Sequence, residues 1–293
     1  MTSESFYESR RKSERFRVGP LRVADARIFV ETSDPDFAAV VRWSFGDLVE
    51  QPGTDAPEVV HEFRVHKRAE PWNRWSMWRD DSSCGIMLEE GYVLFHLQWE
   101  LNRIALERGQ STIHASSVEL AGRAVIFVGS SMSGKTTLAG HLAISGCRFI
   151  ADEIVAIRED GLAEPYLRPL GLRAGGPLEH NFRHPTDFDR RFDAYEMLVP
   201  VSALGAATPL QRTSTPVSAV IFPKYTPATP TTLSPLAKAV ALEQLCSSAP
   251  GLSRHGRVVF RQLAQLVQGV PTAEMKVSDL GPTRQLIESL VIG

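Results

Sequence analysis

The chain has 293 residues, a formal net charge of −2, and 43% hydrophobic and 23% charged residues. This composition is ordinary for a folded protein, and it excludes general disorder as well as broad attraction to nucleic acid or anionic membranes. Cys84, Cys147 and Cys246 are too far apart in the sequence for a disulfide framework or a Cys-x-x-Cys zinc site. Since no secretion signal or apolar run of about 18 residues occurs, we expect a cytoplasmic protein with reduced thiols.

Residues 1–105 predict a smaller, accessory α+β region without any catalytic string. Short alternations of apolar and polar residues indicate strands, and longer apolar periodicity indicates helices. The expected elements are strands at 21–23 and 27–31, a helix around 37–41, and a helical stretch after 92–101 that ends near Arg108-Gly109.

Three tryptophans, Trp72, Trp75 and Trp78, lie in this region at spacing i, i+3, i+6. A stripe of this kind is typical of core packing or of an edge strand, and a peptide-binding surface is the alternative interpretation. The sequence leaves both open.

Residues 106–293 predict a second, larger domain of mixed strands and helices. A first strand, a glycine turn and a second strand come first. The second strand then leads into a glycine-rich loop, a helix and a third strand. A Gly-, Pro-, His- and Arg-rich stretch later in the chain predicts a long loop. The expected elements are strands at 113–120, 125–128 and up to 152, the loop at 174–215, a strand at 217–222, a Pro-rich stretch at 223–235, a helix from about 235, and alternating helix and strand after it.

The most informative segment is Gly129-Ser-Ser-Met-Ser-Gly134-Lys135-Thr136, which has the Gly-x-x-x-x-Gly-Lys-Thr pattern of a P-loop. Backbone N–H groups of such a loop turn inward, and the dipole of the following helix favours phosphate. The pattern predicts that Lys135 reaches the β- and γ-phosphates and that Thr136 binds Mg²⁺. The residues expected to contact ATP here are Gly129, Ser130, Ser131, Ser133, Gly134, Lys135, Thr136 and Thr137.

Two acids follow the next apolar strand. Asp152 stands where a P-loop protein places the carboxylate that holds Mg²⁺, and Glu153 follows at once. Neighbouring strand residues point to opposite faces, so the two acids share a site only if the strand has ended. We expect Asp152 to serve the metal and Glu153 to take the acceptor proton; a surface acid is the alternative for Glu153.

His114 precedes Lys135 on a strand that is expected to form a hairpin with the P-loop strand. This pairing would bring the imidazole to the phosphate end of the site, where a histidine could assist proton transfer. A structural histidine is the alternative.

Three segments, 113–118, 122–139 and 146–155, resemble the kinase domain of the HPr serine kinase/phosphorylase family. They are most similar to stand-alone relatives of that family that are found with peptide-modification pathways, over about residues 105–245. The resemblance implies a P-loop core shared distantly with phosphoenolpyruvate carboxykinase. It also implies that His114 and Glu153 face the reacting phosphoryl group, with Asp152 at Mg²⁺.

The chain departs from the family pattern at three places. Glu153 replaces the usual aspartate, and Met132 occupies a loop position that glycine usually fills, which is costly if φ is positive there. The Arg-Gly-Leu-Gly signature of the bifunctional members is absent, and the stretch 164–173 instead resembles a Pro-x-x-Arg-Pro-x-x-Leu-[Lys/Arg] pattern of the stand-alone relatives. The departures favour a kinase without phosphorolysis activity.

Arg168 and Arg173 in this stretch are candidate phosphate ligands, because a guanidinium fork matches phosphate oxygens. A pair of surface arginines is the alternative for them.

The sequence thus predicts an α/β fold with α+β tendency, built on a mixed β-sheet with flanking helices. It predicts an ATP- and Mg²⁺-dependent kinase that phosphorylates a hydroxyl, most of all serine, of a peptide or protein. A small-molecule kinase and a nucleotide-hydrolysing regulator are the alternatives, since residues 1–105 and 174–215, which would shape the acceptor pocket, carry no motif. Nucleic acid and membrane are not expected as partners, and a homo-oligomer is left open.

Overall fold

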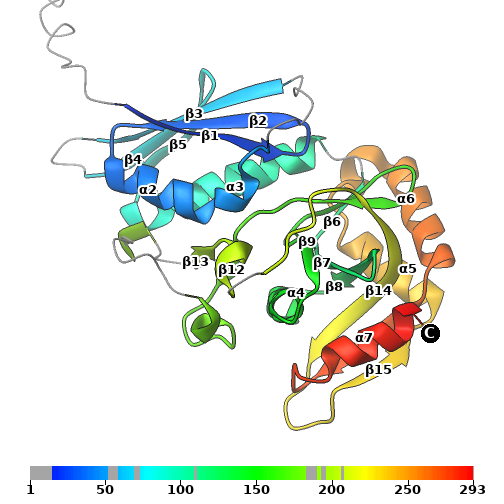
Figure 1. Ribbon diagram of the computed structural model, residues 1–293. Coiled ribbons are helices and arrows are strands. Elements are labelled where there is room, and N and C mark those ends of the chain that lie inside the picture. Colours follow the sequence, from blue (N-terminus) through cyan, green and yellow to red (C-terminus); the bar gives the residue numbers. More distant parts are fainter. Residues whose placement is uncertain are drawn as a thin grey trace, which may run out of the picture.

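The computed structural model describes residues 15–51, 59–68, 73–108, 111–182, 190–192, 196–205 and 208–292. The predicted mixed α/β architecture is confirmed: a five-stranded sheet lies above a nine-stranded mixed sheet, with helices packed on both (Figure 1). The division at residue 105 stays a prediction. None of the described helices is long and apolar enough to cross a bilayer.

The N-terminal sheet has strand order β1-β2-β3-β4-β5, with β2 and β3 parallel and the other neighbours antiparallel. Alternating buried residues along β2 form one face of this sheet, and helices α2 and α3 pack against the sheet. The elements are β1 (Phe16–Val23), β2 (Ala26–Thr32), α2 (Pro35–Ser44), β3 (Val59–Lys67), β4 (Trp75–Arg79), β5 (Ser82–Leu88) and α3 (Glu90–Arg108).

The tryptophans do not form one stripe. Trp75 is buried in β4, and its ring lies 5.1 Å from that of Phe37 of α2. Trp78 is partly exposed farther along the same strand, and Trp72 lies outside the described residues. Because an i, i+3 spacing on a strand does not keep to one face, Trp75 belongs to the core and Trp78 does not.

The larger sheet is organised around β14, the longest strand, which pairs in parallel with β8 and with β16. Strand β7 lies between β8 and β9 and is antiparallel to both, so β8 and β9 run parallel and α4 makes the crossover between them. The strands are β6 (Ser111–Ile113), β7 (Ala115–Leu120), β8 (Arg123–Val128), β9 (Arg148–Ala151), β10 (Val155–Ile157), β11 (Leu162–Glu164), β14 (Thr215–Tyr225), β15 (Thr232–Pro235) and β16 (Thr272–Val277).

In the part of the chain that the structure describes, four helices accompany this sheet. Helix α4 packs on β7, β8 and β9, and α7 packs on β14 and β15. Helix α6 bends at Gly256, whose φ is 25°. The helices are α4 (Lys135–Ile144), α5 (Lys238–Ser247), α6 (Leu252–Gly269) and α7 (Thr283–Ile292).

Two sequence-based predictions need correction. The single strand expected at 113–120 is divided at His114, because β6 pairs with β10 whereas β7 pairs with β8 and β9. The loop expected at 174–215 contains β13 (Met197–Val199), which pairs with β12 (Leu170–Leu172). A strand of three residues is too short to give a visible alternation.

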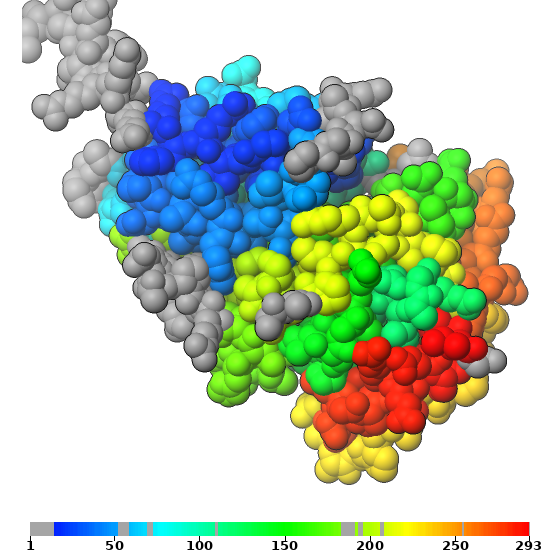
Figure 2. Space-filling model, viewed as in Figure 1, coloured from blue at the N-terminus to red at the C-terminus, as the bar shows by residue number. Residues whose placement is uncertain are grey.

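The two sheets meet through side chains from distant parts of the chain. The carboxylate of Asp47 accepts a hydrogen bond from the backbone N–H of Ser202 at 3.0 Å, and Arg191 pairs with Asp36 of α2 at 2.9 Å. Figure 2 shows the resulting contact between the N-terminal sheet (blue) and the yellow-green part of the chain. Helix α3 runs between the two sheets (Figure 1).

Candidate functional site

The predicted P-loop connects β8 to α4 as the sequence indicates. Gly134 is the N-cap of α4 with φ 94°, a left-handed conformation that glycine adopts without steric cost. No side chain caps the first turn of α4, so its N–H groups are available to an anion. This local geometry is that of a phosphate-binding loop.

The loop holds Lys135 in a buried position, with 6% of the residue exposed. Its Nζ donates hydrogen bonds to the carbonyl oxygens of Gly129 at 2.8 Å and Ser130 at 2.9 Å. Burial lowers the pKa of Lys135, and the nearby charges of Glu153 and Asp152 act in the opposite direction. The ammonium is thus held at the loop by carbonyls that a phosphate oxygen could replace.

Backbone strain accompanies the loop. Met132 has φ 66°, so the residue in the usual glycine position does adopt a left-handed conformation. Ser133 Oγ is buried without a hydrogen-bond partner, and it lies 2.7 Å from the point that a Cβ on Gly129 would occupy. Gly129 is therefore required for the close approach of the two ends of the loop.

Asp152 follows β9 and is 1% exposed. Its Oδ1 and Oδ2 each lie 3.1 Å from Thr136 Oγ1, which donates to them, and the Ser116 hydroxyl of β7 also donates to Oδ1. Burial raises the pKa of Asp152, and the charge of Arg168 acts against that increase. Thr136 and Asp152 thus bring hydroxyl and carboxylate oxygens together, and these are the atom types that Mg²⁺ prefers.

Glu153 does not point away from Asp152, because the strand has already ended at Ala151. Its φ of 63° turns the chain, and its carboxylate Oε2 lies 3.2 Å from Nδ1 of His114. The same ring nitrogen is 3.1 Å from the Glu153 carbonyl oxygen. The turn thus lets two neighbouring acids serve the same site.

The charges of His114 and Glu153 depend on each other. The hydrogen bond to Glu153 raises the pKa of His114. Burial raises the pKa of Glu153, but the hydrogen bond from His114 and the charges of Arg168, His114 and Lys135 outweigh it and lower this pKa to about 2. Each shift favours the charged form of its group, and both side chains line the same cavity as Lys135.

Arg168 is buried, with 4% exposed, so the alternative of a surface arginine is wrong for this residue. Its Nε and Nη1 atoms are buried without a hydrogen-bond partner. A buried guanidinium that lacks partners is costly, and a bound anion would satisfy it. Arg173 is mostly exposed and lies 3.8 Å from the carboxylate of Glu196.

These side chains share one cavity of about 590 Å³. Gly129, Ser130 and Ser133, which the sequence pattern predicts to contact ATP, do not line this cavity. Residues of α3 and of the segments next to β12 and β13 also line it. The predicted site residues that line it are His114, Ser131, Gly134, Lys135, Thr136, Thr137, Asp152, Glu153, Arg168 and Arg173.

Sequence reasoning missed several polar residues at this cavity. Ser116, which donates to Asp152, stands two positions after His114, and that spacing along the chain was the available signal. Glu196 also lines the cavity. It lies so close to Gly171 that a Cβ atom added to Gly171 would be 2.1 Å from Glu196 Oε2. Burial raises the pKa of Glu196. Gln98 and Asn102 of α3 carried no sequence signal.

Comparisons with known proteins place the chain in no family. No family model matches it, and no curated protein matches its sequence. Among solved structures it is similar to the Hpr(Ser) kinase/phosphatase from Coxiella burnetii, with 13% sequence identity and a TM-score of 0.29 over 62% of this chain and 93% of that one.

Proposed function

We propose that the protein is an ATP- and Mg²⁺-dependent kinase that transfers the γ-phosphoryl group to a hydroxyl. The observation that carries the proposal is the convergence on one cavity of a P-loop lysine, a Thr–Asp oxygen pair, a His–Glu pair and a buried arginine with unpartnered nitrogens. Phosphoryl transfer needs these elements: a cradle for phosphate, a metal site, a proton acceptor and charge neutralisation.

The residues present fit both a nucleotide and a metal ion. Thr136 Oγ1 and the Asp152 carboxylate would hold Mg²⁺, which neutralises negative charge on the phosphates when it is bound. Lys135 exchanges its loop carbonyls for phosphate oxygens, and the N–H groups of the loop and α4 hold the rest of the phosphate chain. Arg168 supplies its free nitrogens to the transferring group.

Glu153 is the proposed acceptor of the hydroxyl proton. A carboxylate with a pKa of about 2 is a weak base, because an efficient base has a pKa near the working pH. Part of the lowering comes from the charges of Arg168 and Lys135, which a polyphosphate would compensate. Substrate binding would therefore raise the pKa of Glu153 and make it a better base at the time of transfer. His114 orients this carboxylate through the contact at 3.2 Å.

Our proposed acceptor is a serine hydroxyl of a peptide or protein. The sequence resemblance to kinases of peptide-modification pathways supports this choice, and so does a cavity of about 590 Å³ whose walls come from distant parts of the chain. The absence of the Arg-Gly-Leu-Gly signature supports a kinase without phosphorolysis.

The decisive variant is Lys135→Ala. A charge-assisted contact to the transferring group is worth several kcal/mol in a desolvated site, so we expect a loss of at least about 10³ in the rate of Mg-ATP turnover. ATP turnover is measured with and without Mg²⁺, and nucleotide binding is measured with a fluorescent ATP analogue. Wild-type turnover by Lys135→Ala, or a wild-type protein that does not bind ATP, would refute the proposal.

A further inference from the structure

One face of α3 forms a wall of the cavity that contains the P-loop. Phe95, Gln98, Trp99 and Asn102 follow the i, i+3, i+4, i+7 spacing of a single helix face, and all four line the cavity. The phosphate-binding and proton-transfer chemistry described above uses none of them. A role for this face has to come from what else the cavity would hold.

The place of this face is fixed by Tyr166. The hydroxyl of Tyr166 donates to Asn102 Oδ1 at 3.0 Å, and its backbone N–H donates to the carbonyl of Ile150 at 2.9 Å. Tyr166 also forms a β-bridge with Ala151, the residue before Asp152. The α3 face is therefore attached next to the carboxylate end of the site. The γ-phosphoryl group and the attacking hydroxyl meet at that end, whereas the nucleobase is separated from it by the ribose and two phosphates.

Gln98 gives this face a hydrogen-bonding requirement. It is 2% exposed, and its Nε2 donates to Asn102 Oδ1 at 3.1 Å, whereas its Oε1 is buried without a partner. A buried amide oxygen that stays unpaired is costly, so a ligand that supplies an N–H group stabilises it. A peptide unit carries an N–H donor as well as a carbonyl acceptor, so its N–H group can donate to Gln98 Oε1.

The remaining two residues add a flat, uncharged surface. Trp99 is 48% exposed, and its ring contacts His96, at 5.6 Å between ring centroids, and the guanidinium of Arg103, which lies 5.2 Å from the ring centroid. Phe95 lines the same side. By contrast, Arg173 and Glu196, which also line the cavity, are charged. A neutral wall with aromatic rings suits main chain and apolar side chains rather than a carboxylate or phosphate group.

We infer that the α3 face is the acceptor subsite, and that it holds a peptide segment next to the serine that is phosphorylated. Gln98 pairs with a main-chain amide of that segment, and Trp99 packs against a neighbouring side chain. This inference rests on the proposed kinase function and names where and how its acceptor binds. It also gives the N-terminal region a direct part in acceptor choice.

The test uses the full chain, labelled ATP, and a mixture of blocked peptides with serine at the centre and randomised flanking positions. Gln98→Leu keeps the approximate volume and removes the amide, and Trp99→Ala removes the ring. The loss of one buried hydrogen bond or one packed ring corresponds to about a tenfold rise in the apparent KM for peptide. We expect the KM for ATP to change less than about threefold in both variants.

Phe260→Ala is the matched control, because Phe260 lies on α6, is 49% exposed and does not line the cavity. It should leave both KM values unchanged. If a variant raises the KM for ATP but not the KM for peptide, the α3 face would be assigned to the nucleobase and the inference would be overturned. ATP hydrolysis by the wild type without label transfer to any peptide would overturn it as well. A wild type that neither binds nor hydrolyses ATP would instead refute the proposed function, and the inference with it.

Discussion

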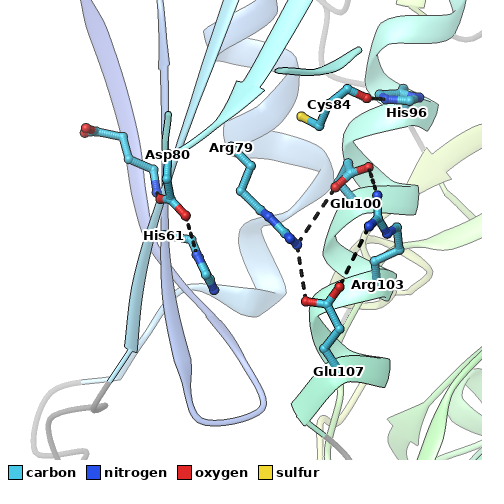
Figure 3. A network of polar contacts seen from close by, with 9 residues as sticks. His61, Arg79, Asp80, Cys84, His96, Glu100, Arg103 and Glu107 are labelled. Atoms are coloured by element: carbon cyan, nitrogen blue, oxygen red, sulfur yellow. Dashed lines mark hydrogen bonds and ion pairs between the residues drawn. The ribbon is translucent and has the colours of Figure 1, made fainter. Parts of the chain in front are cut away.

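Among the described residues, two of the places that bury charged side chains differ in how those charges are paired. Between α3 and β4, Glu100 is fully buried and ion-paired: its Oε1 accepts from Arg103 at 2.9 Å, and its Oε2, which has no hydrogen-bond partner, lies 4.0 Å from Arg79 (Figure 3). Glu107 joins the same two arginines. In the P-loop cavity, Arg168 is also buried, but two of its nitrogens have no hydrogen-bond partner, and its charge acts on Asp152 and Glu153 from nearby.

We use the difference to predict which charges stabilise the fold and which bind a ligand. Removing one member of a buried ion pair destabilises a protein, because the other charge is left buried without compensation. Changes in the α3–β4 cluster should therefore alter stability, and changes in the cavity should alter activity.

The largest expected effect on activity within the cavity, after that of Lys135, belongs to Glu153. Glu153→Gln removes the proton acceptor and should lower the rate of phosphoryl transfer by about 10² to 10⁴. Nucleotide binding, measured by titration, should stay within a few-fold of the parent. His114→Ala should cost less, and the double variant should cost less than the product of the two, since both serve one step. Full additivity would contradict a shared role.

Arg168→Met tests the comparison directly. Loss of one guanidinium from the transferring group should lower kcat by about 10² to 10³, as for other preorganised donors. The free energy of unfolding should fall by less than about 2 kcal/mol, because Nε and Nη1 have no hydrogen-bond partner to lose, while Asp152 and Glu153 lose a nearby positive charge. Chemical denaturation beside steady-state kinetics measures both. A large loss of stability would identify Arg168 as a structural ion.

Glu100→Gln is the opposite case. It leaves two arginines facing a neutral amide, and we expect the free energy of unfolding to fall by about 1–3 kcal/mol, since both arginines are partly exposed and water compensates part of the loss. Glu107→Gln is the matched control: it contacts the same arginines but is 35% exposed, so its cost should be under about 1 kcal/mol. Equal costs for the two variants would remove the distinction by burial.

The smallest effect concerns pH. The pKa of His114 is raised above 6.5, so its contribution to stability is complete below that pH and disappears as the pH rises through the folded-state value. The pKa of Glu153 falls from 4.5 to about 2, so its contribution is complete above 4.5 and disappears as the pH falls toward 2.

The stability difference between wild type and His114→Asn should therefore be largest between pH 4.5 and 6.5. With side chains 39% and 40% exposed, it should stay under about 1 kcal/mol. Urea denaturation at pH 3, 5.5 and 9 would reveal it, and a difference that grows toward pH 9 would contradict the pairing.

The sequence predicted the strand, loop and helix around Lys135 because that segment is local: hydrophobic alternation, two glycines and a lysine suffice to define it. It also predicted the approach of Thr136 to Asp152, since both belong to one crossover. The roles of these residues stay predictions. The partner change at His114 could not be predicted, because only the sheet order decides that β6 pairs with β10.

The burial of Arg168 and the position of Gln98 were equally out of reach of the sequence. Both depend on contacts between α3, the β9 end and the β12–β13 hairpin, which are far apart along the chain. Composition and spacing describe a residue's neighbours in sequence, whereas these contacts come from the packing of one sheet on another. The N-terminal region has little local pattern of its own, and it contributes to the cavity through α3.

The left-handed backbone at Met132 has a consequence for how such loops are found. A P-loop grips phosphate with its main-chain N–H groups, so the shape of the chain is what must be kept, and the letter at each position is secondary. Here a methionine, 78% exposed, takes a conformation with φ 66° that glycine would adopt more easily. A search pattern written with glycine at that place would pass over this chain, while a comparison of backbone torsion angles would retrieve it.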